Sequence, residues 1–304
     1  MQRLRHGPIL PADGPADHPA EPVHERDTRE VDPATAPPPM EVLEAFGLRG
    51  PARSLAGGQR RTFEADGAVL KVADDAAEAA WVQDLAARLD PTIVRVARPL
   101  PTTDGSWTHD SWTASVFVRG LSPAAPDWAT VTDAGRRFTE AASTIEDLDT
   151  RVLRTRTHRW ARADRCAWAE EAITLTGRAE HLQVSLRQLT IESDQPNQVI
   201  HGDLAGNVHL DEDGRPVVLD ISPFVRPARW GDAIVVADAV TWRGGSPALA
   251  TAFADDSAGV DLLARALIFR LVAEQLGGVG ANPPSLEPYE RLVGLLRVAG
   301  PSTS

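Results

Sequence analysis

Residues 199–222 have the sequence VIHGDLAGNVHLDEDGRPVVLDIS, and this stretch decides the fold that we predict. Two short apolar runs, Val208–Leu210 and Val217–Leu219, are separated by the polar run DEDGR. An Asp-Gly pair between two such runs is typical of a β-hairpin. We therefore predict two paired strands, with Asn207 just before the first strand and Asp220 just after the second.

The open end of this hairpin brings oxygen-bearing side chains together. Paired strands lie about 5 Å apart, so Asn207 and Asp220 are expected to meet, and Asp203 lies in the loop that leads to the same end. Two carboxylates and an amide suit Mg²⁺, which completes its shell with water and phosphate oxygens. Each residue alone also fits a structural role, as a turn former, a strand-end cap or a loop solubiliser. Their spacing as a set favours a metal site.

The chain contains one lysine, Lys71, beside 30 arginines. It lies within the apolar run GAVLKVA, residues 67–73, which predicts a strand. Arginine is a wide planar fork, whereas lysine is a compact charge on a slim stem. Two explanations stay open: a site that needs the lysine shape, or the chance survival of one exposed lysine in an arginine-rich chain.

Hydrophobic periodicity predicts a strand-rich region followed by a helical one. Residues 54–119 mostly follow a strand pattern, interrupted by a helical pattern in DDAAEAAWVQDLAARL, residues 74–89. Asp75 and Glu78 fit a capping box at the start of that helix. From about residue 130 onward the pattern is helical, apart from the hairpin stretch.

We accordingly predict an α+β chain in three parts. Residues 1–39 carry nine prolines and few large apolar groups, which predicts a disordered tail, and Met40 is an alternative start. Residues 40–119 are predicted to form a small antiparallel β-rich N-lobe. Residues 120–304 are predicted to form a larger, mainly helical C-lobe that holds the hairpin.

Composition restricts the partners and the compartment. The net charge of −12 and the pI of about 5.1 argue against binding to a nucleic acid or an anionic membrane. No apolar run approaches the ~20 residues of a membrane span. A single cysteine, Cys166, excludes an internal disulfide and favours the cytoplasm. Helical spacing predicts core positions for Cys166 and four tryptophans, although the tryptophans could instead line an acceptor site: Trp160, Trp168, Trp230 and Trp242.

The sequence HGDL at residues 201–204, Asn207, and DIS 13 residues beyond that asparagine together resemble a known catalytic core. They are similar to the aminoglycoside phosphotransferase and protein-kinase-like superfamily, and to its actinobacterial phosphotransferase-like members. The resemblance implies a bilobal protein-kinase-like fold. It further implies Mg²⁺-dependent transfer of the ATP γ-phosphoryl group to a hydroxyl of a small molecule, so that the expected partners are a nucleotide and that acceptor.

Carried over to this sequence, the resemblance implies a role for each motif residue. Asp203 would be the catalytic aspartate that orients the acceptor or takes its proton. Asn207 and Asp220 would hold Mg²⁺ on the nucleotide. Lys71 would pair with the α- and β-phosphates, where a slim ammonium fits better than a guanidinium fork.

The resemblance also implies supporting residues in the N-lobe. Glu78 would be the helix partner of Lys71, with the capping box as the alternative. Gly57 and Gly58 would form a flexible turn over the phosphates. The connector Ser115–Val118 would offer backbone amides to the adenine.

Two departures from the family pattern leave a second function open. Only three residues separate Asp203 from Asn207, one fewer than usual, and Ser222 stands where protein kinases have glycine. A tighter loop favours a pseudokinase-like scaffold or sensor that binds nucleotide without turnover. His201 could act as a general base, but we predict that it bonds the loop backbone instead.

Overall fold

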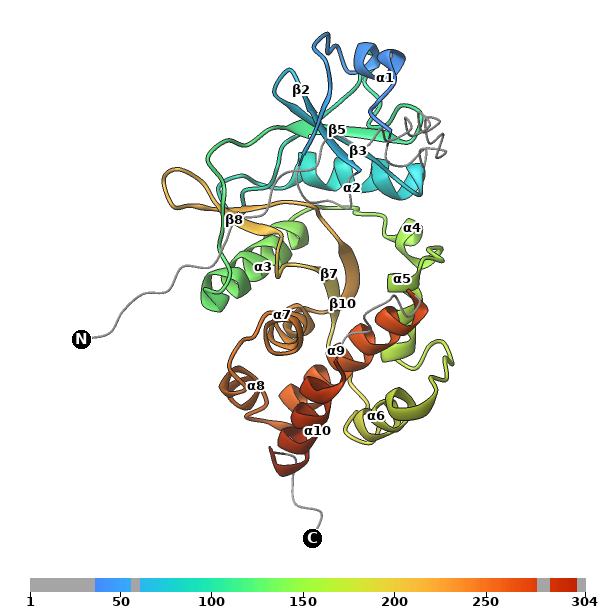
Figure 1. Ribbon diagram of the computed structural model, residues 1–304, viewed down its shortest axis with the longest axis vertical. Coiled ribbons are helices and arrows are strands. Elements are labelled where there is room, and N and C mark those ends of the chain that lie inside the picture. Colours follow the sequence, from blue (N-terminus) through green and yellow to red (C-terminus); the bar gives the residue numbers. More distant parts are fainter. Residues whose placement is uncertain (1–35, 56–60, 278–284, 300–304) are drawn as a thin grey trace, which may run out of the picture. The chain divides into compact units, whose positions relative to one another are not determined.

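A computed structural model describes residues 36–55, 61–277 and 285–299 of the chain, and the described residues from Pro37 onward belong to one compact unit. The unit is an α+β fold with a β-sheet lobe followed by a helical lobe, as predicted (Figure 1). The predicted tail falls almost wholly outside the described residues. Gly57 and Gly58 also lie outside them, so the turn over the phosphates stays a prediction.

The N-lobe is built on one antiparallel sheet with strand order β1-β2-β3-β5-β4. Alternation along β3 buries Leu70 and turns Lys71 to the other face, because neighbouring strand residues point to opposite sides. Leu70 packs in a core with Phe63, Trp112 and the short N-terminal helix. The elements are α1 (Met40–Ala45), β1 (Arg53–Ser54), β2 (Thr62–Ala65), β3 (Ala68–Val72), β4 (Pro99–Leu100) and β5 (Trp112–Val116).

The helix α2 (Ala76–Arg88) follows β3, as the sequence predicts. The Asp75 carboxylate caps it by accepting hydrogen bonds from the backbone N–H groups of Ala77 and Glu78, at 2.8 and 3.0 Å. Leu85 of α2 belongs to the same buried cluster as Phe138 of the C-lobe, and not to the core of the sheet. The helix therefore contacts the C-lobe as well as strands β4 and β5 of the N-lobe sheet.

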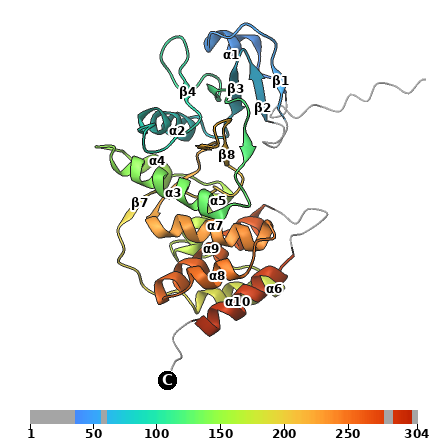
Figure 2. The same cartoon turned by 90° about the vertical axis from the view of Figure 1, so that its left-hand side faces the viewer.

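The helices of the C-lobe surround α9, which is buried along most of its length. The buried residues of α9 fall on all of its sides and not on one face, as expected for a helix at the centre of a domain. Figure 2 shows α3 lying between α2 and α7, and these three helices share one buried cluster. The helices are α3 (Trp128–Ser143), α4 (Arg151–Arg154), α5 (Arg159–Ala167), α6 (Gly177–Arg187), α7 (Ala228–Trp242), α8 (Ala248–Phe253), α9 (Ser257–Leu276) and α10 (Glu287–Ala299).

The predicted hairpin is confirmed, with its second strand one residue earlier than expected. Strand β8 (Val208–Leu210) pairs antiparallel with β9 (Pro216–Val218), and β6 (Ser122–Pro123) joins on the other side of β8. A second pair, β7 (Asn197–His201) with β10 (Pro223–Pro227), leads into and out of the hairpin. Strand β10 was not predicted from the sequence, because it begins and ends with proline and proline usually interrupts strands. The structure shows that proline is tolerated at these two positions because they are strand ends.

Candidate active site

The loop between β7 and β8 is fixed by two close approaches. An added Cβ at Gly202 would lie 2.4 Å from the Phe224 ring, so only glycine fits beside that ring. Leu204 is 1% exposed, and an added Cβ at Gly135 of α3 would lie 2.4 Å from its side chain. The two glycines thus hold Asp203, which lies between Gly202 and Leu204, in a defined position.

His201 links this loop to the segment after the hairpin. Its Nδ1 accepts a hydrogen bond from the backbone N–H of Asp203 at 3.1 Å, and its Nε2 lies 3.4 Å from the backbone nitrogen of Ser222. Burial lowers the pKa of His201 and outweighs the nearby Asp203 and Asp220 carboxylates. A neutral imidazole that accepts from the backbone fits the structural role predicted for His201.

Asn207 stabilises Asp203 in spite of the shortened loop. Its Nδ2 donates to the backbone carbonyl of Asp203 at 2.7 Å and lies 3.2 Å from Asp203 Oδ2. The backbone carbonyl of Asn207 accepts from the N–H of Leu219 at 2.7 Å. The hairpin therefore places Asn207 beside the residue that precedes Asp220, as its predicted register requires.

Lys71 and Asp220 meet directly. The Lys71 Nζ lies 2.6 Å from Asp220 Oδ1, and the two side chains are 37% and 57% exposed. Asp220 has φ of 36°, in the left-handed region that residues other than glycine rarely adopt. Such conformations persist where the surroundings impose them, and they concentrate at functional sites.

Glu78 does not pair with Lys71 in the structure. Its Oε1 accepts from Arg156 Nη1 at 2.9 Å, and its Oε2 lies 3.5 Å from His158 Nε2. Burial opposes ionisation of Glu78, but hydrogen bonds from His158 and Arg156 outweigh it and lower the pKa of this carboxyl. In place of the predicted partnership with Lys71, the Glu78 carboxylate is directed to Arg156 and His158. The capping alternative holds for Asp75 only.

The predicted connector to the adenine is divided by the end of β5. Ser115 lies within β5, opposite Val69 on one side and Pro99 on the other. Val118 lies beyond the strand, in the connection toward β6. The roles of Ser115 and Val118 in nucleotide binding stay predictions. Val118 is better placed to offer its backbone amide to the adenine, because it lies outside the sheet.

Sequence reasoning missed a buried ion pair that supports Asp203. Arg270 of α9 is 1% exposed and donates to Asp238 of α7 from Nε at 2.6 Å and from Nη2 at 2.5 Å. The same Nη2 lies 3.1 Å from the Gly202 carbonyl and 3.3 Å from Asp203 Oδ1. Burial raises the pKa of Asp238 to about 6, while Arg270 opposes that rise and keeps the carboxylate ionised at neutral pH.

A signal for this pair was present in the sequence. Asp238 interrupts the apolar run DAIVVADAV and Arg270 interrupts ALIFRLVA. Because charged residues are almost never fully buried without a partner, two such interruptions of otherwise apolar helical runs indicate a pair.

The predicted core positions are confirmed for Cys166 and three tryptophans. Cys166 and Trp230 are 1% and 0% exposed, and Trp160 and Trp168 pack on the same cluster. Trp242 departs from the prediction, since it is 38% exposed. Its ring lies 4.9 Å from the Arg270 guanidinium carbon, and its indole N–H donates to Glu274. Trp242 therefore borders the group that contacts Asp203.

The donor set around the hairpin fits a hard cation. No three His, Cys, Asp or Glu side chains gather as a metal site anywhere in the described ranges. Asn207 and Asp220 supply one amide oxygen and one half-exposed carboxylate. Such a pair suits Mg²⁺ that takes its other ligands from water and phosphate.

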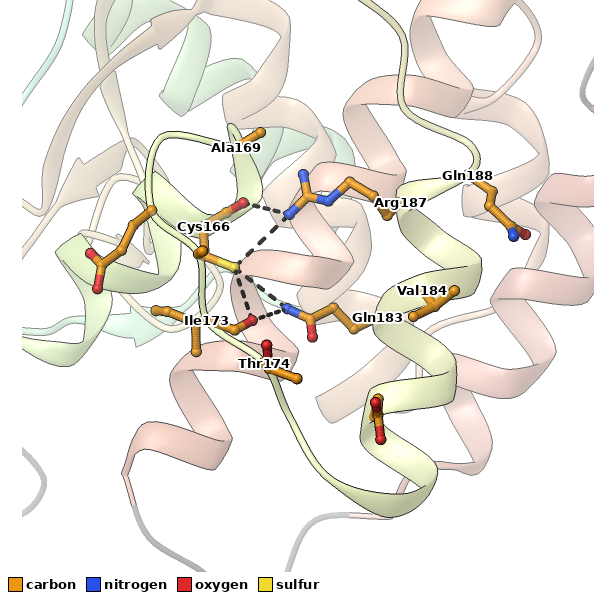
Figure 3. A pocket seen from close by; sticks show the side chains of 11 residues that line it. Cys166, Ala169, Ile173, Thr174, Gln183, Val184, Arg187 and Gln188 are labelled. Atoms are coloured by element: carbon orange, nitrogen blue, oxygen red, sulfur yellow. Dashed lines mark hydrogen bonds between the residues drawn. The ribbon is translucent and has the colours of Figure 1, made fainter.

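A cavity of about 460 Å³ lies elsewhere, at the C-terminal end of α5 and beside α6. Figure 3 shows Gln183 and Arg187 of α6 directed toward Cys166. Gln183 donates to the Ile173 carbonyl of the α5–α6 loop at 2.8 Å, and Arg187 donates to the Cys166 carbonyl at the end of α5 at 2.6 Å. None of the predicted site residues lines this cavity.

The fold matches solved structures of small-molecule kinases. An aminoglycoside phosphotransferase from Alicyclobacillus acidocaldarius aligns with a TM-score of 0.55 and 14% identity, covering 90% of this chain and 98% of that one. Amicoumacin kinase, solved with AMP-PNP, Ca²⁺ and amicoumacin, aligns with a TM-score of 0.57 and 12% identity over 86% and 92%. The choline kinase LicA from Streptococcus pneumoniae aligns with a TM-score of 0.53 and 11% identity, covering 85% of this chain and 97% of that one. The chain thus has a protein-kinase-like fold, as the resemblance predicted.

No known family profile matches the sequence, and no curated protein matches it. Within residues 36–55, 61–277 and 285–299, no helix combines the length and the apolar sequence needed to cross a membrane.

Proposed function

We propose that this chain is an ATP- and Mg²⁺-dependent phosphotransferase that acts on a hydroxyl group of a small molecule. One observation carries the proposal: Lys71 of the N-lobe sheet contacts Asp220 of the C-lobe hairpin at 2.6 Å. These are the two residues that the kinase-like pattern places on the nucleotide phosphates and on the metal.

Each side chain has a distinct part in the proposed reaction. Lys71 would move from Asp220 to the phosphates of the bound nucleotide. Asp220 and Asn207 would hold Mg²⁺, whose charge stabilises the phosphoryl group in transfer. Asp203 is half exposed, so its carboxylate would accept a hydrogen bond from the acceptor hydroxyl while Asn207 and Arg270 keep it in place.

The structures with a similar fold support both ligands of the proposal. Amicoumacin kinase was solved with AMP-PNP and amicoumacin. A mutant aminoglycoside phosphotransferase, which aligns with a TM-score of 0.54 and 12% identity, was solved with ADP and hygromycin B. In our proposal the adenine would contact the backbone near Val118, and the turn at Gly57 and Gly58 would cover the phosphates. The exposed ring of Trp242 would contact the acceptor.

Thermal denaturation with ATP and Mg²⁺ tests nucleotide binding. We expect a rise in melting temperature that is lost in Lys71→Ala and in Asp220→Ala. Asp213→Asn changes an exposed carboxylate in the turn of the same hairpin and should keep the full rise. No rise at millimolar nucleotide in the wild-type protein would contradict the proposal.

Turnover separates the phosphotransferase from the scaffold alternative that the short loop suggests. We expect ADP release with at least one member of a panel of hydroxylated small molecules. Asp203→Asn should still bind nucleotide but lose about 10²- to 10⁴-fold in kcat, the usual contribution of a general base. Nucleotide binding without ADP release from any acceptor would favour the scaffold.

A further inference from the structure

Arg156 joins α2 to the strand that follows Asp220. Its Nη1 donates to Glu78 Oε1 and to the backbone carbonyl of Pro223, both at 2.9 Å. Its guanidinium carbon lies 4.7 Å from the centre of the Phe224 ring. The Arg156 side chain is 4% exposed, so these contacts are shielded from water. One buried cation therefore bonds the helix, the strand and the ring together.

The helix α2 is attached to the C-lobe at further points. The Trp81 indole N–H donates to the Asp149 carbonyl at 2.6 Å, and Arg88 Nη2 donates to the Glu146 carbonyl at 2.9 Å. Leu85 lies in the buried cluster that contains Phe138 of α3. With these contacts and the Glu78–Arg156 pair, α2 is positioned without an ion pair to Lys71. The Lys71 ammonium contacts Asp220 instead of Glu78.

We propose that Arg156 is a positioning residue that holds Asp220 in place through Pro223. This inference rests on the proposed function, because it assigns importance to Asp220 as the partner of Lys71 and of the metal. Pro223 lies three residues after Asp220, and Asp220 has a φ of 36° that its surroundings must impose. His201 contacts the backbone of Ser222 between them, so Arg156 and His201 constrain the segment together.

Removing the Arg156 guanidinium should release this segment. The Pro223 carbonyl and the Glu78 carboxylate would both lose a charged donor inside the protein, which favours rearrangement over an unpaired buried group. The Asp220 side chain would then spend less time against Lys71. The reactivity of the Lys71 amine reports that change, and the chain has no other lysine to confuse the measurement.

The experiment measures acylation of Lys71 by peptide mass spectrometry without nucleotide. We expect Arg156→Gln to increase the rate about fivefold, the size of effect that follows from losing one partly exposed ion pair. The matched control is Arg226→Gln, which removes another buried arginine, on β10, with partners Asp164 and Glu170. The control should lower the melting temperature and leave the Lys71 rate unchanged.

An equal increase in both variants would show general loosening and overturn the proposal, as would an unchanged rate in Arg156→Gln. If Arg156→Gln fails to fold, Glu78→Ala removes one of the two acceptors of Nη1 and should increase the rate in the same direction; no increase there also overturns it. Because the assay contains no nucleotide, its failure is distinct from failure of the proposed phosphotransfer.

Discussion

The Lys71 ammonium lies 2.6 Å from the Asp220 carboxylate although 149 positions separate the two residues in the chain. The contact joins β3 of the N-lobe sheet to the residue that follows the C-lobe hairpin. Each lobe thus contributes one half of an ion pair, and both halves are partly exposed. An exposed pair of this kind adds little stability, so we interpret it as a feature of the site and not of the fold.

Replacing Lys71 by arginine should preserve the ion pair with Asp220 but weaken nucleotide binding. Lys71→Arg keeps a cation that can pair with Asp220, so the melting temperature should stay near that of the wild type. The wider guanidinium would fit poorly between phosphates. We expect ATP affinity, measured by calorimetry with Mg²⁺, to fall on the order of tenfold or more. Wild-type affinity in this variant would contradict the explanation for the single lysine, and Lys71→Met provides the comparison without a cation.

Removing one charge of the Arg270–Asp238 pair should lower the unfolding free energy more than removing both charges. Arg270→Gln leaves a fully buried carboxylate without its cation, and such changes cost about 3–5 kcal/mol in unfolding free energy. The double variant Arg270→Gln with Asp238→Asn removes both charges and should cost less. Urea unfolding measures both. Arg137→Gln, at an exposed pair with Asp133, is the control and should change stability little.

If the double variant were as unstable as Arg270→Gln alone, an unpaired charge would not be the cause of the loss. Arg270→Gln should also reduce turnover, because Arg270 contacts Asp203 and the Gly202 carbonyl.

Local patterns were sufficient to predict the hairpin, the strand around Lys71 and the mainly helical C-lobe. The hairpin follows from the Asp-Gly turn and two apolar runs, and Lys71 lies on β3 because alternation sets its face. The hairpin also predicted that Asn207 and Asp220 lie at the same end of it, and the backbone of Asn207 bonds that of Leu219, the residue before Asp220. These features depend on residues close in sequence, which is why they could be predicted.

The partners of Glu78 could not be predicted from local sequence in the same way. A glutamate near the start of a helix fits a cap, a kinase-like partner of lysine or a distant ion pair equally well, and only tertiary structure decides between them. Arg156 lies 78 positions away and carries no motif of its own. The contact of Leu85 of α2 with the buried cluster of Phe138 likewise depends on tertiary structure, because periodicity does not specify which residues a leucine meets.

Acid should remove the stability that Glu78 contributes. Its pKa is lowered in the folded protein relative to the ordinary value of 4.5, so ionised Glu78 stabilises the fold above that pH. As the pH falls below 4.5 and through the folded pKa, this contribution is lost. The difference in unfolding free energy between wild type and Glu78→Gln should therefore be full near neutral pH and shrink in acid, as measured by urea unfolding.

A matched control is Glu290→Gln, which removes an exposed carboxylate paired with Arg178. Its difference from wild type should be small at every pH, because exposed pairs contribute little. A Glu78→Gln difference that grew as the pH fell would have the wrong sign and contradict the interpretation.

A single methyl group at Gly202 should disturb both the core and the site. The added Cβ would lie 2.4 Å from two carbons of the Phe224 ring, which is 2% exposed and packs edge-on against Phe269 with ring centres 5.5 Å apart. Because that ring has no room to retreat, the loop must shift and move Asp203 with it. We expect Gly202→Ala to cost about 1–3 kcal/mol in unfolding free energy, as overpacking usually does, and to reduce turnover further than binding. Gly294→Ala in α10, where nothing lies within 4 Å of the added atom, should be neutral or slightly stabilising; equal melting temperatures for the two variants would show that Phe224 does not confine the loop.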